Sequence, residues 1–322
     1  MLVRTTTRLV ATCVFLLLVA GALVTSTQSG LAVPDWPLSY GKLLPPMVGG
    51  ILYEHGHRLV AAAVSTLVGV QILVLWLGKA PRRTFRLALL AFGAILCQAL
   101  LGGLTVLLLL PPAVSSAHAG LAQVVFALAA TIALRSSAAW ETIEAAAPVP
   151  AALSGETARA HRLVLAATAS AYVQILLGAV VRHTGAGLSI PDFPTTFGKV
   201  VPSLADLATP GVPIQLAHRL GAVVVSTLVV LAARSVFRLR GALPFVDRAA
   251  TVWVVVLGVQ VTLGAFSVWS GKAVPVTAAH LAGGALLWAT GVLLSVTLGR
   301  LRRGADDPGP VRAAAPAGSL PA

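Results

Sequence analysis

The sequence predicts an all-α integral membrane protein whose eight transmembrane helices form two pseudo-symmetric four-helix bundles. Three observations support this prediction. Of the 322 residues, 57% are hydrophobic and only 10% are charged, a balance unlike that of a soluble domain. The apolar residues gather in eight runs of about 20 residues, the length that crosses a bilayer as a helix. The second half of the chain also repeats motifs of the first half in the same order.

Each apolar run is interpreted as one membrane helix. The predicted helices are 9–26, 59–77, 87–110, 118–134, 163–181, 220–236, 249–268 and 281–298. Arg4 and Arg8 precede the first run, as basic residues precede the core of a secretory signal. Because that run has a counterpart in the repeat, we interpret it as a retained helix.

The remaining segments divide the chain into two halves. An Ala- and Pro-rich stretch at 136–160 is predicted to be a cytoplasmic linker, and 304–322 a disordered cytoplasmic tail. The linker separates an N-terminal half, 1–135, from a C-terminal half, 161–303. With four helices each, both halves enter the membrane from the same side, as parallel repeats about an axis along the membrane normal.

The formal charge of +13 indicates topology and not nucleic-acid binding. Seventeen of the 23 Lys and Arg residues fall on one side of an eight-helix topology, within 4–8, 79–86, 135–162, 234–248 and 300–312. Basic segments stay on the cytoplasmic side of a membrane. We therefore expect a cell-membrane protein in contact with lipid, with both termini cytoplasmic and no nucleic-acid partner.

The most visible repeat is a Pro-rich loop. GLAVPDWPLSYGK at 30–42 returns as GLSIPDFPTTFGK at 187–199, and both copies are predicted to lie on the outer side. The matched residues that follow the loops are His57-Arg58 with His218-Arg219, Gln98 with Gln260, Gly102 with Gly264, and His118 with His280.

Four histidines at matched positions indicate a ligand set. We predict that His57, His118, His218 and His280 begin helices at the outer side. An ionisable residue at membrane depth is costly unless it serves a function. Two imidazoles from neighbouring helices can ligate a haem iron, whereas zinc usually takes three or four protein ligands. The predicted metal ligands are therefore the pairs His57–His118 and His218–His280.

Basic residues beside these histidines are candidate partners of haem propionates. A guanidinium matches a carboxylate bidentately, which suits Arg58 and Arg219 to this role. The alternative is an anchor that reaches lipid phosphate. Lys42 and Lys199, repeated in the loops, are weaker candidates of the same kind, and the role of His183 is open.

The two halves differ three residues before the first histidine of each pair, where Glu54 corresponds to Gln215. A carboxylate beside a macrocycle could act as an acid or base, or stabilise positive charge, while a substrate is oxidised. The alternative is a helix-start residue favoured by the helix dipole. The difference predicts that the first half binds a substrate and the second half holds a permanent redox cofactor.

These residues resemble the haem A synthase family over nearly the whole chain. The resemblance rests on Glu54-x-x-His57-Arg58, on His118, and on the second pair, His218 and His280. It implies an oxidoreductase that converts the C8 methyl of haem O to a formyl group by successive hydroxylation and dehydration, giving haem A for cytochrome oxidase. In this family the second pair is taken to ligate a haem b that relays electrons, and the first pair to hold haem O, with the carboxylate important for activity. A haem O synthase and an electron donor are the implied partners.

The chain departs from some members of this family in one feature, and two alternative functions remain open. Some bacterial family members carry a cysteine pair in the first outer loop, but 28–53 contains no cysteine, so a mechanism that needs this pair cannot operate here. A dihaem electron-transfer cytochrome would hold permanent haems at both pairs. A repeat-built transporter would need a polar path at the midplane of the membrane.

Overall fold

The computed structural model describes residues 1–146, 149–239 and 244–306, so the tail predicted at 304–322 lies outside it from 307 onward. In this part of the chain, eight helices are long and apolar enough to cross a membrane, which confirms the predicted all-α, multi-pass fold class. They are α1 (Leu2–Ser26), α2 (Gly49–Leu77), α3 (Arg82–Leu107), α4 (Pro112–Arg135), α6 (Ala151–His183), α8 (Val212–Phe237), α9 (Pro244–Trp269) and α10 (Val274–Asp306). The short elements are α5 (Ala138–Ala145), η1 (Ala186–Leu188) and α7 (Leu204–Leu207).

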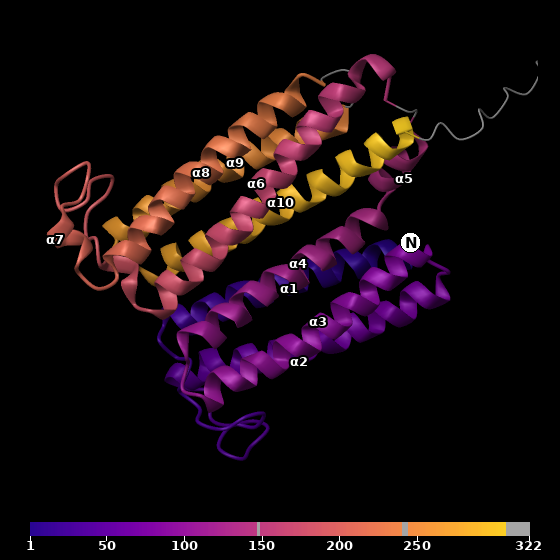
Figure 1. The fold of residues 1–322 in the computed structure, drawn as a ribbon. Coiled ribbons are helices and arrows are strands. Elements are labelled where there is room, and N and C mark those ends of the chain that lie inside the picture. The colour runs from indigo at the N-terminus through magenta and orange to yellow at the C-terminus, as the bar shows by residue number, and fades with distance from the viewer. Residues whose placement is uncertain (147–148, 240–243, 307–322) are drawn as a thin grey trace, which may run out of the picture.

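The spanning helices pack in two groups of four that lie side by side (Figure 1). In the first group, α1 and α3 each pack against α2 and α4; in the second, α6 and α9 each pack against α8 and α10. In each group the second and fourth helices are therefore diagonal to each other. This packing is consistent with the two bundles that the repeat predicts.

Most of the helices extend beyond the apolar runs that predict them. α2 begins at Gly49 and α8 at Val212, well before the predicted starts at 59 and 220. The runs follow hydrophobicity alone, whereas backbone hydrogen bonds continue through the polar turns at the end of a membrane helix. The predicted helix-start position of the four histidines was consequently wrong, because all four lie inside helices.

The segment predicted as a linker, 136–160, contains α5 and the first turns of α6. Ser137 caps α5, since its hydroxyl accepts from the backbone N–H of Trp140 at 3.2 Å. Trp140 is buried, and Glu141 forms an ion pair with Arg4 at 2.6 Å. α5 therefore packs at the end of the molecule that contains the N-terminus (Figure 1).

Two long loops, 27–48 and 184–211, project from the opposite end, which we call the loop end (Figure 1). Each contains a tight turn in which two residues exchange backbone hydrogen bonds of 2.8–3.1 Å. These residues are Ser39 and Lys42 in the first loop and Thr196 and Lys199 in the second. The repeated sequence therefore encodes the same local fold twice.

The repeated Asp holds each turn closed. Asp35 and Asp192 each accept two backbone N–H groups from the tip of the turn, those of Tyr40 (2.7 Å) and Gly41 (2.9 Å) in the first loop and of Phe197 and Gly198 (both 2.8 Å) in the second. Gly41 and Gly198 have φ values of 69° and 74°, a region that glycine adopts without strain. Asp and Gly therefore recur for the geometry of the turn.

Polar contacts join the two groups of helices at the loop end. The Thr277 hydroxyl of α10 donates to Ser26 Oγ of α1 at 3.0 Å. Arg182, near the end of α6, donates to the backbone carbonyls of Ala22 at 3.4 Å and Thr277 at 3.3 Å. At this end the two halves contact each other through α1, α6 and α10, and α4 also packs against α6 and α10.

The first loop packs against α3 through Trp36 and Gly103. A Cβ atom at position 103 would lie 2.7 Å from Cδ2 of Trp36, closer than two carbon atoms can pack. The repeat-equivalent residues of the second half are Phe193 and Ala265. The second half therefore combines a smaller ring with a larger helix residue.

Gly103→Ala should displace Trp36 and destabilise the protein by about 1–3 kcal/mol, the usual cost of overpacking. Adding Trp36→Phe recreates the residues of the second half and should recover most of this loss. Thermal unfolding of the two single variants and the double variant in detergent measures the effect. A double variant no more stable than Gly103→Ala alone would contradict this packing.

The Asp192 carboxylate accepts a hydrogen bond from a side-chain donor that Asp35 lacks. The pKa of Asp192 is lowered from 3.8 to about 2, first because the Thr195 hydroxyl donates to it and then because backbone N–H groups do. The pKa of Asp35 is also lowered, by the N–H groups of Gly41 and Tyr40, but Leu38 stands where the second loop has Thr195. A carboxylate with a lowered pKa stabilises the fold above its unfolded pKa, and this stabilisation is lost as pH falls through the folded pKa.

On acidification below pH 4, the first loop should therefore open to pepsin at a higher pH than the second loop. Thr195→Leu should raise the pH at which the second loop is cut. Mapping the cleavage sites by mass spectrometry between pH 4 and about pH 2 checks both expectations. Simultaneous cleavage of both loops in the unmodified protein would contradict the assigned role of Thr195.

Candidate functional site

The four matched histidines lie in two diagonal pairs near the loop end. His57 and His118 come from α2 and α4, and His218 and His280 from α8 and α10. Within each pair, the two imidazoles are close enough to interact electrostatically. We expected the pairs on neighbouring helices; because the helices are diagonal, a group bound by both rings would lie inside the bundle.

The protein uses only part of the hydrogen-bonding capacity of these imidazoles: Gln98 Nε2 lies 3.4 Å from Nε2 of His118, and Gln174 Nε2 lies 3.0 Å from Nδ1 of His218. Nδ1 of His57, His118 and His280 is buried and has no hydrogen-bond partner among the described residues. All four histidine residues nevertheless remain partly exposed. Buried polar atoms usually have a partner, and exceptions often mark functional groups. A neutral imidazole in this state can serve as a metal ligand.

Two imidazoles per pair suit an iron that already has four ligands from a macrocycle. Within residues 1–146, 149–239 and 244–306, no cluster of three or more His, Cys, Asp or Glu side chains could hold a metal ion. Each pair is therefore smaller than the usual ligand set of a zinc centre. Two imidazoles would be enough to hold a haem, whose macrocycle supplies the other ligands of the iron.

Glutamine side chains tie two of the ligand helices to their neighbours. Gln98 Nε2 donates to the His118 carbonyl at 3.0 Å. Gln174 Nε2 donates to the His218 carbonyl at 2.7 Å and lies 3.0 Å from Nδ1 of the same residue. α1 has Leu17 at the position equivalent to Gln174, so the first half has no such amide between its first two helices.

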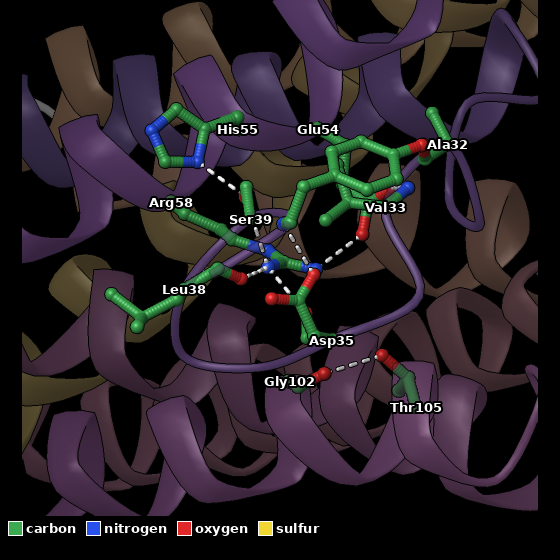
Figure 2. Close-up of polar contacts among 11 residues, drawn as sticks. Ala32, Val33, Asp35, Leu38, Ser39, Glu54, His55, Arg58, Gly102 and Thr105 are labelled. Atoms are coloured by element: carbon green, nitrogen blue, oxygen red, sulfur yellow. Dashed lines mark hydrogen bonds and ion pairs between the residues drawn. The ribbon is translucent and has the colours of Figure 1, made fainter. Parts of the chain in front are cut away.

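Glu54 and Arg58 form an ion pair that anchors the first loop (Figure 2). Arg58 Nη2 lies 2.5 Å from Glu54 Oε1, and their side chains are only 13% and 5% exposed. The second carboxylate oxygen accepts from the backbone N–H of Val33 at 2.9 Å. Arg58 Nη1 donates to the carbonyls of Asp35 and Leu38, both at 2.7 Å. Both charged groups are therefore engaged at the base of the loop.

Gln215 and Arg219 anchor the second loop from the equivalent positions, but without an ion pair: Gln215 Nε2 donates to the carbonyls of Gly187 at 3.0 Å and Ile190 at 3.3 Å. Gln215 Oε1 accepts from the backbone N–H of Ile190 at 2.5 Å. Arg219 donates to the carbonyls of Thr195 at 2.9 Å and Asp192 at 2.6 Å. The side chain at this position accepts a loop N–H in both halves, but only the first half uses an anion.

The structure also shows the contacts of the other predicted site residues, which are arginines, lysines and a histidine. Loop contacts account for the guanidinium groups of Arg58 and Arg219, and their role toward propionates stays a prediction. Lys42 is exposed, and Lys199 pairs with Asp206 at 3.2 Å. His183 ends α6 beside Arg182 and lies within electrostatic range of His118.

His55 is an anchor of the first loop that the sequence did not indicate. Its Nδ1 lies 2.6 Å from Ser39 Oγ, and its Nε2 lies 2.9 Å from the Leu43 carbonyl (the Ser39 contact is drawn in Figure 2). Because a carbonyl only accepts, Nε2 carries the proton and Nδ1 accepts from the hydroxyl. Both ring nitrogens are thus occupied. The second half has Leu216 here, so the repeat carried no signal for this residue.

Comparison with known proteins agrees with this architecture. Residues 49–292, which include all four histidines, match the COX15-CtaA family of cytochrome oxidase assembly proteins. The chain is 34% identical over 228 residues to a protein named heme A synthase from Symbiobacterium thermophilum, a match that covers 68% of this chain and 70% of that protein. It is 32% identical over 224 residues, with the same coverage, to a protein of that name from Shouchella clausii. The chain therefore belongs to the COX15-CtaA family, the family of the heme A synthases.

Proposed function

We propose that this protein is a haem A synthase, which oxidises the C8 methyl group of haem O to a formyl group by successive hydroxylation and dehydration. The proposal rests on a duplicated histidine pair in which, within the part of the chain that the structure describes, only the first copy has a buried carboxylate nearby. The names of its relatives support the same activity. The product would supply a cytochrome oxidase, in keeping with the description of the family.

The first half is the proposed site of haem O. His57 and His118 would bind the iron of the substrate, and the loop at 27–48 would cover the site at the loop end. A substrate must enter and leave, which favours ligands that are held less firmly than those of a resident cofactor. The leucine at position 17, where the second half has Gln174, supports this assignment because His57 has no glutamine amide beside it.

The second half is the proposed site of a resident haem b. When bound, this group would supply one-electron transfer to the oxidation in the first half. His218 and His280 would hold it, and Gln174 would fix the helix that bears His218 through its two contacts with that residue. An amide at position 215 anchors the second loop without adding a charge near this site.

Glu54 is the proposed acid or base of the first site. It lies on α2 with His57, and at a spacing of three residues both occupy one side of the helix. A positioned carboxylate could take a proton from a reacting group or stabilise positive charge that develops on the macrocycle. Arg58 would keep the carboxylate oriented between these events.

The proposed setting is the cell membrane, with the loop end outside and both termini in the cytoplasm. The basic segments at the end of the molecule opposite the two loops support this orientation, because basic segments stay on the cytoplasmic side of a membrane. An electron donor and a haem O synthase are the proposed partners.

A dihaem electron-transfer cytochrome is the second candidate. It is favoured by the equivalent contacts of Glu54 and Gln215, each of which accepts a backbone N–H from its loop. In such a cytochrome, the Glu54 carboxylate would serve only to anchor the first loop, and both histidine pairs would hold permanent haems.

The bound haems distinguish the two candidates. Protein purified from cells that make haem O should contain haem b together with haem O or haem A. His218→Ala or His280→Ala should remove the haem b, and His57→Ala or His118→Ala should remove only the other haem. Extraction followed by chromatography identifies each pigment. A protein that contains haem b alone, whatever haem the cells supply, would overturn the synthase proposal.

Glu54→Gln should lower the rate of haem A formation by about 100-fold or more, the usual contribution of a positioned acid or base. Gln215 shows that an amide oxygen at this position can accept a loop N–H. Glu54→Gln therefore removes the charge but keeps an acceptor for the first loop. Unchanged content of both haems in the Glu54→Gln protein is the control, because it shows that both sites still form. Product analysis and haem content are measured together. A Glu54→Gln protein with full activity would exclude the proton-transfer role.

A further inference from the structure

A glycine faces each ligand histidine from the neighbouring helix. A Cβ atom added to these glycines would lie 3.0–3.2 Å from Cε1 of the ring. The contacts are Gly21 with His57 (3.1 Å), Gly102 with His118 (3.1 Å), Gly178 with His218 (3.0 Å) and Gly264 with His280 (3.2 Å). We propose that these four glycines are positioning residues, which set how each imidazole is presented to its iron. The inference rests on the haem ligation proposed above.

The glycines and histidines divide the eight spanning helices between them. α2, α4, α8 and α10 each carry a ligand histidine, and α1, α3, α6 and α9 each carry the facing glycine. Each glycine helix packs directly against the ligand helix that follows it among the spanning helices. Gly21 is equivalent to Gly178 in the repeat, as Gly102 is to Gly264. The contact is therefore a feature of the repeating unit.

Backbone conformation does not require glycine at these positions. All four lie inside helices and are absent from the glycines with positive φ. Glycine in a helix interior is less favourable than alanine, so another factor must offset this cost. Gly93 in α3 and Gly258 in α9 show the contrast, because an added Cβ would meet nothing within 4 Å at either position. The four glycines that face histidines differ from Gly93 and Gly258 because each leaves space for an imidazole ring.

An added methyl group would move the ring. Carbon atoms in contact normally lie about 3.5–4.0 Å apart, so each imidazole would have to retreat by a few tenths of an ångström. The missing side chain thus lets a ring lie against the helix backbone. Groups that orient a ligand ring tune the metal that it binds.

Gly264→Ala and Gly178→Ala should therefore shift the largest g value of the low-spin ferric signal of the resident haem, and its reduction midpoint. Gly264→Val should weaken haem retention by about 10–100-fold, the usual effect of losing a group that orients a ligand. Gly21→Ala and Gly102→Ala should lower the content of haem O and leave the haem b signal unchanged. Electron paramagnetic resonance, redox titration and pigment extraction on the purified full-length protein measure these effects.

Gly93→Ala and Gly258→Ala are the matched controls, because they add the same methyl group to α3 and α9 away from any ring. If Gly264→Ala and Gly258→Ala give identical signals and haem contents, the positioning role is overturned. Unmodified protein without any bound haem would instead overturn the proposed function itself, so the two failures are distinguishable.

A second measurement applies even where a variant loses its haem. In haem-free protein, Gly264→Ala should lower the thermal midpoint, but Gly264→Ala combined with His280→Ala should not lower it below that of His280→Ala alone. Such coupling is expected only when the methyl and the ring compete for one space. Additive effects of the two substitutions would refute the contact.

Discussion

A buried acceptor near the start of α2, and another near the start of α8, ties each loop to the helix that follows it. A membrane helix satisfies its own backbone, but a loop that folds over the helix end brings N–H groups that need a partner. Glu54 accepts from Val33, and Gln215 accepts from Ile190. Since His57 and His218 follow three residues later on α2 and α8, the position of each loop is fixed relative to a proposed iron ligand.

The two halves share these loop anchors but differ in several residues near the loop end. The first half has an anion at the acceptor position, a histidine anchor at His55 and a Trp36 that requires Gly103. The second half has Gln174 against its first ligand where the first half has Leu17. Both loops are anchored by several side-chain hydrogen bonds, but the first ligand of the first half, His57, lacks an amide. This combination suits a covered site in which the bound group must exchange.

The sequence predicted the features that depend on composition and on the repeat. Eight apolar runs correctly indicated eight membrane helices, because a bilayer imposes both length and hydrophobicity. Helix starts such as Gly49 were missed, because polar turns continue a helix without an apolar signal. The packing around the histidines was also hidden, since glycine is common in membrane helices and Gly102 alone does not reveal which ring it faces. Arg58 was predicted to bind a propionate or lipid phosphate, and its contacts with loop carbonyls were missed because no sequence pattern indicates them.

The contacts of Glu54 connect its proposed chemistry to the loop. Its two oxygens are already used, one by Arg58 and one by the backbone of Val33. A proton gained at either oxygen would weaken the attraction to Arg58, which also binds the carbonyls of Asp35 and Leu38. Proton transfer and closure of the first loop would therefore be coupled through one ion pair. In the second half, the neutral Gln215 has no charge to lose, so this coupling would be absent from the second loop.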